Sequence, residues 1–195
     1  MAWLAGLGGA VVAGFWWLRA DAGHAPAQPV SFSHALHAGE LEIDCRYCHG
    51  GAETSPVAGI PATTVCMNCH ATIGKENPLL DPVRESAQSR EPIRWARVHR
   101  LGDDVAFHHG AHVRAGIGCA SCHGRVDEME VVRQEEPYTR TWCLDCHHDP
   151  APHLRAPHEV TKMRWIAPPD QVERGRLRIR ENRLDPATDC SGCHQ

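Results

Sequence analysis

An uncharged hydrophobic stretch runs from residue 2 to residue 18 and contains no strongly polar side chain. Its length is near the lower limit for a helix that crosses a bilayer, about 17 residues. Trp3, Trp16 and Trp17 lie near its two ends, where aromatic residues collect at membrane interfaces. The pattern predicts one N-terminal transmembrane helix.

A cleaved signal peptide is the rival interpretation of this stretch. Ala20-Asp21-Ala22 is similar to an A-x-A cleavage site, but no basic residue follows Met1, as a signal peptide would require. We therefore favour an uncleaved anchor. Whether the segment is processed in the cell is left open by the sequence.

The rest of the chain is poor in hydrophobic side chains. Aromatic residues make up 6% of the 195 residues, and the mean hydropathy is −0.40. The chain therefore cannot build a large aliphatic core. Its 14 prolines and 17 glycines favour loops interrupted by short helices.

Ten cysteines change this picture, because they form five C-x-x-C pairs and each pair is followed directly by a histidine. No cysteine is left over. We number these motifs 1 to 5 in chain order: Cys45, Cys48 and His49; Cys66, Cys69 and His70; Cys119, Cys122 and His123; Cys143, Cys146 and His147; Cys190, Cys193 and His194.

C-x-x-C-H is the attachment motif of c-type haem, in which two thiols bond covalently to the porphyrin and the adjacent histidine ligates the iron. Zinc or redox C-x-x-C sites do not need a histidine after every pair. Histidine is only 15 of 195 residues, so five such placements do not arise by chance. A disulfide framework fits the repeated two-residue spacing poorly. We expect five covalently bound haem c groups, with the five motif histidines as proximal iron ligands.

Five haems on so short a chain must themselves form the core. The expected fold is a small, loop-rich multihaem cytochrome c with short α-helices and a haem core, preceded by one transmembrane helix. Because haem attachment is completed outside the cytoplasmic membrane, we expect the haem domain to lie in the periplasm, anchored to the bacterial inner membrane.

A second repeat accompanies the motifs. The sequence F-x-H-x-x-H occurs at residues 32–37 and again at residues 107–112, about ten residues before motifs 1 and 3. Motifs 1 and 2 start 21 residues apart and motifs 3 and 4 start 24 apart, with longer gaps elsewhere. Internal duplication is the natural inference.

The repeat predicts a domain organisation of two dihaem modules and a lone fifth haem. The predicted boundaries are a transmembrane anchor at 1–20, a linker at 21–29 and a haem domain at 30–195, divided into dihaem modules at 30–95 and 96–160 and a fifth-haem segment at 161–195.

Histidines three apart share one helix face but point to slightly different places, so one short helix can supply distal ligands to two haems. We expect His34, His37, His109 and His112 to be distal iron ligands. The fifth is open: His99 comes first and Met163 second, with His148, His153 and His158 as further candidates. A methionine ligand would raise the potential of its haem above that of its neighbours.

The surplus of candidate ligands favours electron transfer over catalysis, because a haem enzyme needs an open iron position. No Ser-His-Asp set, phosphate-binding loop or carboxylate pair stands out, and we predict no catalytic residues. The formal net charge is −4, which argues against nucleic acid as a partner. The arginines at 174, 176, 178, 180 and 183 form either a solvated face or a surface that pairs with haem propionates or an acidic partner.

The F-x-H-x-x-H and C-x-x-C-H pattern resembles the cytochrome c3 and c7 class. Together with the N-terminal stretch, the segment WARVHRLGDDVAFHHGAH at 95–112, and the segments CASCHGRVDEMEVV, TWCLDCHHDP and VTKMRW between 119 and 165, it is similar to the pentahaem membrane-anchored subunit of bacterial alternative complex III. The similarity covers residues 30–195. The additional histidines at 108 and 148 depart from that family's pattern.

This resemblance implies a relay of electrons from quinol oxidation to a periplasmic cytochrome or terminal oxidase. It also implies partners: a polytopic quinol-binding subunit, an iron–sulfur subunit related to molybdopterin oxidoreductases, and a monohaem cytochrome c. Two alternatives stay open, namely the cytochrome subunit of a quinone-reducing complex and a membrane-anchored carrier similar to cytochrome c3. A haem enzyme is a third and would have to leave one iron open to small ligands.

Overall fold

The computed structural model describes residues 21–194. The predicted transmembrane helix lies outside these residues. Within them, no helix combines the length and the hydrophobicity needed to cross a membrane.

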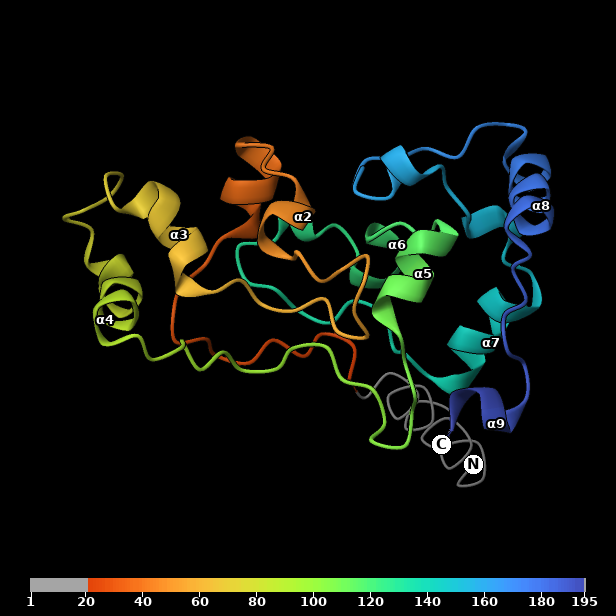
Figure 1. Ribbon diagram of the computed structural model, residues 1–195, viewed down its shortest axis with the longest axis horizontal. Coiled ribbons are helices and arrows are strands. Elements are labelled where there is room, and N and C mark those ends of the chain that lie inside the picture. Colours follow the sequence, from red (N-terminus) through yellow and green to blue (C-terminus); the bar gives the residue numbers. More distant parts are fainter. Residues whose placement is uncertain (1–20, 195) are drawn as a thin grey trace, which may run out of the picture.

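The described chain is a succession of short helices joined by long loops (Figure 1). The α-helices are α2 (Cys45–Cys48), α3 (Thr63–His70), α4 (Asp81–Ser89), α5 (His109–Ala115), α6 (Ala120–His123), α7 (Arg140–His148), α8 (Gln171–Asn182) and α9 (Cys190–Cys193). Single turns of other helix types are η1 (Ala35–Glu40), η2 (Pro78–Leu80), η3 (Val126–Glu128), η4 (Ala151–His153) and η5 (Pro157–Glu159).

Residues 21–194 contain no β-strand. Extended segments meet only as isolated bridges, one between Val105 and His194 and one between Ile117 and Leu154. The expectation of a small, helical and loop-rich chain is confirmed for these residues.

Each C-x-x-C-H motif falls on a helix and its cap residues, and three of those helices begin with a side-chain cap. Asp44 accepts a hydrogen bond from the Arg46 amide at the start of α2, and Asp189 accepts one from the Gly192 amide at the start of α9. Thr139 does the same for α7. These caps satisfy backbone donors that a four-residue helix would otherwise leave free.

The polypeptide buries few hydrophobic side chains of its own. The buried ones are Val30, Val83, Met129, Ala151, Leu154 and Val160, whereas Leu36, Leu41, Tyr47, Val57 and Ile60 are among the large side chains that stay exposed. Residues 21–194 therefore lack the large hydrophobic core that usually stabilises a domain of this length, as the composition predicted.

Helix α8 packs against η4 and contacts the end of α5. The buried Gln171 side chain donates to the carbonyl of Leu154 at 2.7 Å. Arg178 donates to the carbonyls of Ala115 and Arg114 at 2.7 and 3.1 Å, and so satisfies the free carbonyls at the end of α5. At least this arginine of the basic stretch therefore has a structural partner within the chain.

The two halves of the chain exchange contacts reciprocally. In one direction, η1 packs on η3, where the Ala35 amide donates to the Met129 carbonyl at 3.0 Å. In the other, the start of α5 packs on the loop after motif 1, where the Gly110 amide donates to the Ser55 carbonyl at 2.9 Å. Each F-x-H-x-x-H segment thus contacts the residues that follow the first haem motif of the other half.

Candidate haem-binding sites

Four of the five motif histidines are oriented by a backbone carbonyl. The Nδ1 atoms of His49, His70, His147 and His194 lie 2.8, 3.1, 2.6 and 3.1 Å from the carbonyl oxygens of Gly59, Ile73, Ala187 and Asp104. A hydrogen bond at Nδ1 fixes the tautomer that leaves Nε2 free as a metal ligand. His194 also lies 3.1 Å from the Asp104 carboxylate.

In the first half, both histidines of the F-x-H-x-x-H segment face a motif histidine. The rings of His34 and His49 are parallel within 3°, with centroids 6.5 Å apart. The rings of His37 and His70 lie 6.2 Å apart at an interplanar angle of 61°.

The second half repeats this arrangement. His109 faces His123 with ring centroids 6.3 Å apart, and His112 faces His147 at 6.0 Å. Both pairs have an interplanar angle of 31°. The structure therefore brings each of the four histidines that the sequence singled out opposite a different motif histidine.

These separations fit a metal ion between each pair of rings. A bond from imidazole nitrogen to metal is about 2 Å long, so two such bonds plus half of each ring give a centroid separation of about 6 Å. The free thiols of each C-x-x-C pair lie on the same helix as the motif histidine or next to it. The residues present fit covalently attached haem with two axial histidines.

The phenylalanine that begins each F-x-H-x-x-H segment stacks on the second histidine of that segment. Phe32 stacks on His37 with centroids 4.3 Å apart and an angle of 24°, and Phe107 stacks on His112 at 4.6 Å and 30°. Backbone carbonyls complete the positioning, because the Nδ1 atoms of His37 and His112 lie 2.8 and 3.0 Å from the carbonyls of the residues four positions earlier, Ser33 and His108. The phenylalanine therefore helps to orient the second histidine of its segment.

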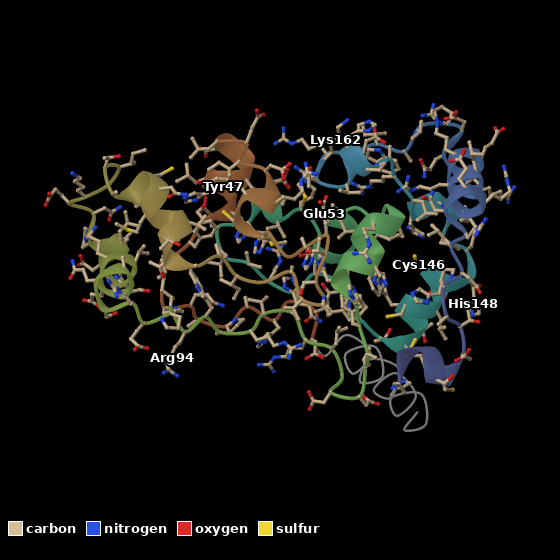
Figure 2. The ribbon with its side chains drawn as sticks, viewed as in Figure 1. Tyr47, Glu53, Arg94, Cys146, His148 and Lys162 are labelled. Carbon is tan, nitrogen blue, oxygen red and sulfur yellow. The ribbon has the colours of Figure 1, made fainter. Side chains whose placement is uncertain are left out.

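His109 is positioned from the other half of the molecule. Its Nδ1 lies 2.8 Å from the carbonyl oxygen of Ala52, in the loop after motif 1. Arg114, on the same helix, donates to the carbonyl of Glu53 at 2.7 Å, and Figure 2 shows Glu53 beside α5. A distal-ligand candidate of the second module is thus held by the first.

Burial lowers the pKa of three of the facing histidines. Burial and the neighbouring His49 lower the pKa of His34 to about 4, and burial together with nearby histidines lowers the pKa of His123 to about 3. Burial also lowers the pKa of His112. A neutral imidazole is the form that binds a metal, so these rings are available as ligands at neutral pH.

His99 contacts the histidine of motif 3 directly. Its Nε2 lies 3.1 Å from Nδ1 of His123, with the two rings nearly perpendicular at 87°. Burial lowers the pKa of His99 to about 4, so its Nε2 can accept a hydrogen bond from His123. His99 therefore occupies the place that a backbone carbonyl fills at the other four motifs.

No ring among residues 21–194 faces His194 as the four pairs face each other. Met163 lies in a segment where Val160 accepts from the Cys119 amide at 2.9 Å and Thr161 donates to Asp44 at 3.1 Å, beside motifs 3 and 1. His148, His153 and His158 are exposed, and Figure 2 shows His148 at the outer edge of the molecule.

Sequence reasoning did not foresee two features of these sites. His108, which departs from the family pattern, accepts a hydrogen bond from the Ala111 amide through its ring and so caps α5. The hydroxyl of Tyr138 donates to the carbonyl of Cys122 at 2.9 Å, next to motif 3. The sequence could have suggested only the first of these features, because His108 lies directly before the expected helix, where capping residues occur.

Comparison with known proteins supports the haem assignment. Residues 105–195 match the family of cytochrome c7 and related cytochrome c proteins. This match covers motifs 3, 4 and 5 and the second F-x-H-x-x-H segment, so this part of the chain is similar to cytochrome c7 proteins.

A second comparison extends beyond that segment. Over 153 residues the chain is 31% identical to a protein of Nitratidesulfovibrio vulgaris named "Menaquinone reductase, multiheme cytochrome c subunit". The aligned region is 78% of this chain and 66% of the relative, so the chain spans slightly less than two thirds of the relative's length.

Proposed function

We propose that this chain is an electron-transfer subunit that carries five covalently bound haem c groups and works inside a quinone-linked membrane complex. When bound, each haem would accept and release one electron at its iron. The ten motif cysteines would hold the groups, and the five motif histidines would be their proximal ligands.

The observation that carries this proposal is the set of four facing histidine pairs at 6.0–6.5 Å. A histidine on each side fills both axial positions, so an iron held there has no open site for a substrate. Saturated iron favours electron transfer over catalysis. We propose no catalytic residue in this chain, and the reaction with quinone belongs to a partner.

The proposed location is the periplasmic face of the bacterial inner membrane. It is supported by the motif, because haem c attachment is completed outside the cytoplasmic membrane, and by the hydrophobic stretch at residues 2–18, which we propose as the anchor. The proposed partners are a polytopic quinone-binding subunit, an iron–sulfur subunit related to molybdopterin oxidoreductases, and a monohaem cytochrome c.

Two directions of electron flow have specific support. The resemblance to alternative complex III favours electrons leaving quinol for a periplasmic cytochrome or oxidase. The relative from N. vulgaris is named a menaquinone reductase subunit, which favours electrons entering the quinone pool. Both directions use the same relay, so the histidine pairs are common to them.

The haem content tests the proposal first. The full chain, expressed with a cytochrome c maturation system and purified in mild detergent, should contain five haems per polypeptide by the pyridine haemochrome assay. Its ferric EPR spectrum should be dominated by low-spin iron. A count of two or three haems, or a spectrum dominated by high-spin iron that binds carbon monoxide after reduction, would contradict it.

The direction is tested on the complex that co-purifies with the chain. Menaquinol added to the oxidised complex should reduce the haems if the complex oxidises quinol. Menaquinone added to the reduced complex should oxidise them if it reduces quinone. A chain that purifies alone in mild detergent, with neither response, would support a membrane-anchored carrier instead.

A further inference from the structure

We infer that the five haem sites form one unbranched row in the order 2, 1, 3, 4, 5, so that the sites of motifs 2 and 5 are its two ends. This inference rests on the proposed function, because it requires all five sites to be occupied. This order differs from that of the motifs along the chain. In the chain order, motif 1 and not motif 2 would lie at one end of the row.

Sites 2 and 1 are neighbours because one short segment serves both. His34 and His37 are three residues apart, and they face His49 of motif 1 and His70 of motif 2. The two motif helices also touch directly, since the Asn68 side chain donates to the Tyr47 hydroxyl at 3.0 Å.

Sites 3 and 4 are neighbours for the same reason. His109 and His112 lie on α5 and face His123 of motif 3 and His147 of motif 4. Tyr138 connects the two motifs, because its hydroxyl donates to the Cys122 carbonyl at 2.9 Å and its ring packs on Trp142, directly before Cys143, with centroids 5.4 Å apart.

The two modules meet between sites 1 and 3. Residues 160 and 161 connect the starts of motifs 1 and 3, because the Cys119 amide donates to the Val160 carbonyl at 2.9 Å and the Thr161 hydroxyl donates to the Asp44 carboxylate at 3.1 Å. His109 of site 3 bonds to Ala52, in the loop after motif 1. The reciprocal contacts of η1 with η3 and of α5 with this loop surround the same junction.

Site 5 adjoins site 4. The Nδ1 of His147 lies 2.6 Å from the carbonyl of Ala187, three residues before motif 5 begins. The Ala106 amide donates to the Cys193 carbonyl at 2.7 Å, so motif 5 also lies against the start of the second F-x-H-x-x-H segment.

The arrangement of helices agrees with these contacts. Figure 1 shows α3, α2, α6 and α7 in succession along the long axis of the molecule, with α9 next to α7. These are the helices of motifs 2, 1, 3, 4 and 5. Partners that exchange electrons with the row would therefore meet it near α3 at one end and near α9 at the other.

Single high-spin sites test the order. In the full-length oxidised protein, His37→Ala, His34→Ala, His109→Ala and His112→Ala each open one axial position and turn one haem high-spin. A high-spin iron shifts and broadens the proton NMR lines of the haem methyl groups next to it. We expect His37→Ala to affect the lines of one other haem, and each of the other three variants to affect the lines of two.

The decisive comparison is which first-module haem borders site 3. His34→Ala should shift lines that the His109→Ala variant identifies with motif 3, and His37→Ala should not. The opposite result would establish the order 1, 2, 3 and overturn the inference.

Variants that lose haem or misfold are replaced by His37→Met and His34→Met, which keep a sixth ligand and still change the lines of their own haem and its neighbours. Haem counting separates the two proposals. Fewer than five haems in the unaltered chain contradicts the proposed function, whereas five haems with other neighbours contradicts only the order.

Discussion

His99 shows how one residue can distinguish a haem site from its neighbours. Four motif histidines are held by backbone carbonyls, while His123 bonds to the His99 side chain. A hydrogen bond at Nδ1 orients an axial histidine and increases its basicity toward the metal. A side chain in this position, unlike a carbonyl, can be removed by substitution.

We expect His99→Phe to raise the potential of one haem by about 20–60 mV, the equivalent of one lost hydrogen bond of about 0.5–1.5 kcal/mol. The potential rises because a less basic ligand stabilises ferric iron less. Mediated redox titration of the purified chain measures it.

His99→Gln supplies the control, because an amide oxygen can still accept from His123 and should keep the potential near its original value. If His99→Phe instead produced a high-spin haem, His99 would be an iron ligand. This is the role for which the sequence ranks His99 first among the candidates for the fifth distal position. Unchanged potentials in both variants would leave His99 no role at this site.

The facing pairs give a second expectation for single residues. His112→Ala should convert one haem in five to high-spin iron, visible in the ferric EPR spectrum, and His112→Met should keep that haem low-spin and raise its potential. His108→Ala is the matched control, since His108 only caps α5 and its loss should cost about 1 kcal/mol without high-spin signal. A fully low-spin His112→Ala protein would refute the assignment.

At the scale of elements, the two F-x-H-x-x-H segments perform one task with different backbones. The first forms the π-helical turn η1, with His34 at its N-cap, and the second forms the α-helix α5, which begins at His109. The expected single helix is therefore only approximately right for the first segment. Tertiary contacts to η3 and to the loop after motif 1 hold both in place, because neither is long enough to be stable alone.

Three of the motif helices, α2, α6 and α9, are only four residues long, and α2 and α9 each begin with a side-chain cap. Asp44 caps α2 and also pairs with Arg46, whose hydrogen bond lowers the pKa of this carboxyl from 3.8 to about 2. We expect Asp44→Ala to lower the free energy of unfolding by about 1 kcal/mol in a guanidinium titration that follows the haem spectrum.

The pH dependence of this cap has a definite sign. Since the pKa is lower in the folded chain, the ionised carboxylate stabilises the fold above about pH 4, and this contribution disappears as the pH falls toward 2. Because Asp44 is largely exposed, solvent screens its ion pair and the effect is small. Asp44→Asn should keep the cap and lose only the pH-dependent part, and equal unfolding energies for Ala and Asn would argue against the cap.

At the scale of the whole molecule, two glycines allow the halves to approach. A Cβ on Gly110 would come within 2.8 Å of the Glu53 backbone, and one on Gly39 would collide with the Asp127 carbonyl. Both positions belong to the reciprocal contacts between η1, η3, α5 and the loop after motif 1. Larger residues there must push the modules apart.

We expect Gly39→Ala and Gly110→Ala each to destabilise the protein by about 1–3 kcal/mol, as overpacking does. Each should also reduce the effect that a high-spin haem at site 1 has on the NMR lines of the haem at site 3. Gly50→Ala is the control, since open space surrounds that position, and its effect should stay within about 0.5 kcal/mol. If all three variants behave alike in denaturant titration, the glycines are not needed for the junction.

The sequence by itself determined what is local in this protein. The five C-x-x-C-H motifs and the two F-x-H-x-x-H segments are contiguous patterns, and the sequence alone predicts haem attachment from their residue types and spacing. The loop-rich, helical character followed from composition. None of these features depends on where distant parts of the chain meet.

Only the tertiary structure decided which residues meet. His34 and His37 face the histidines of different motifs, and His99 contacts His123. The second half of the chain contacts the loop after motif 1, whereas the order of the motifs along the chain would place motif 2 next to motif 3. Hydrogen bonds link residues tens of positions apart, as between His109 and Ala52. The physical reason is that a chain without a large core folds through such individual contacts, and their partners leave no periodic trace in the sequence.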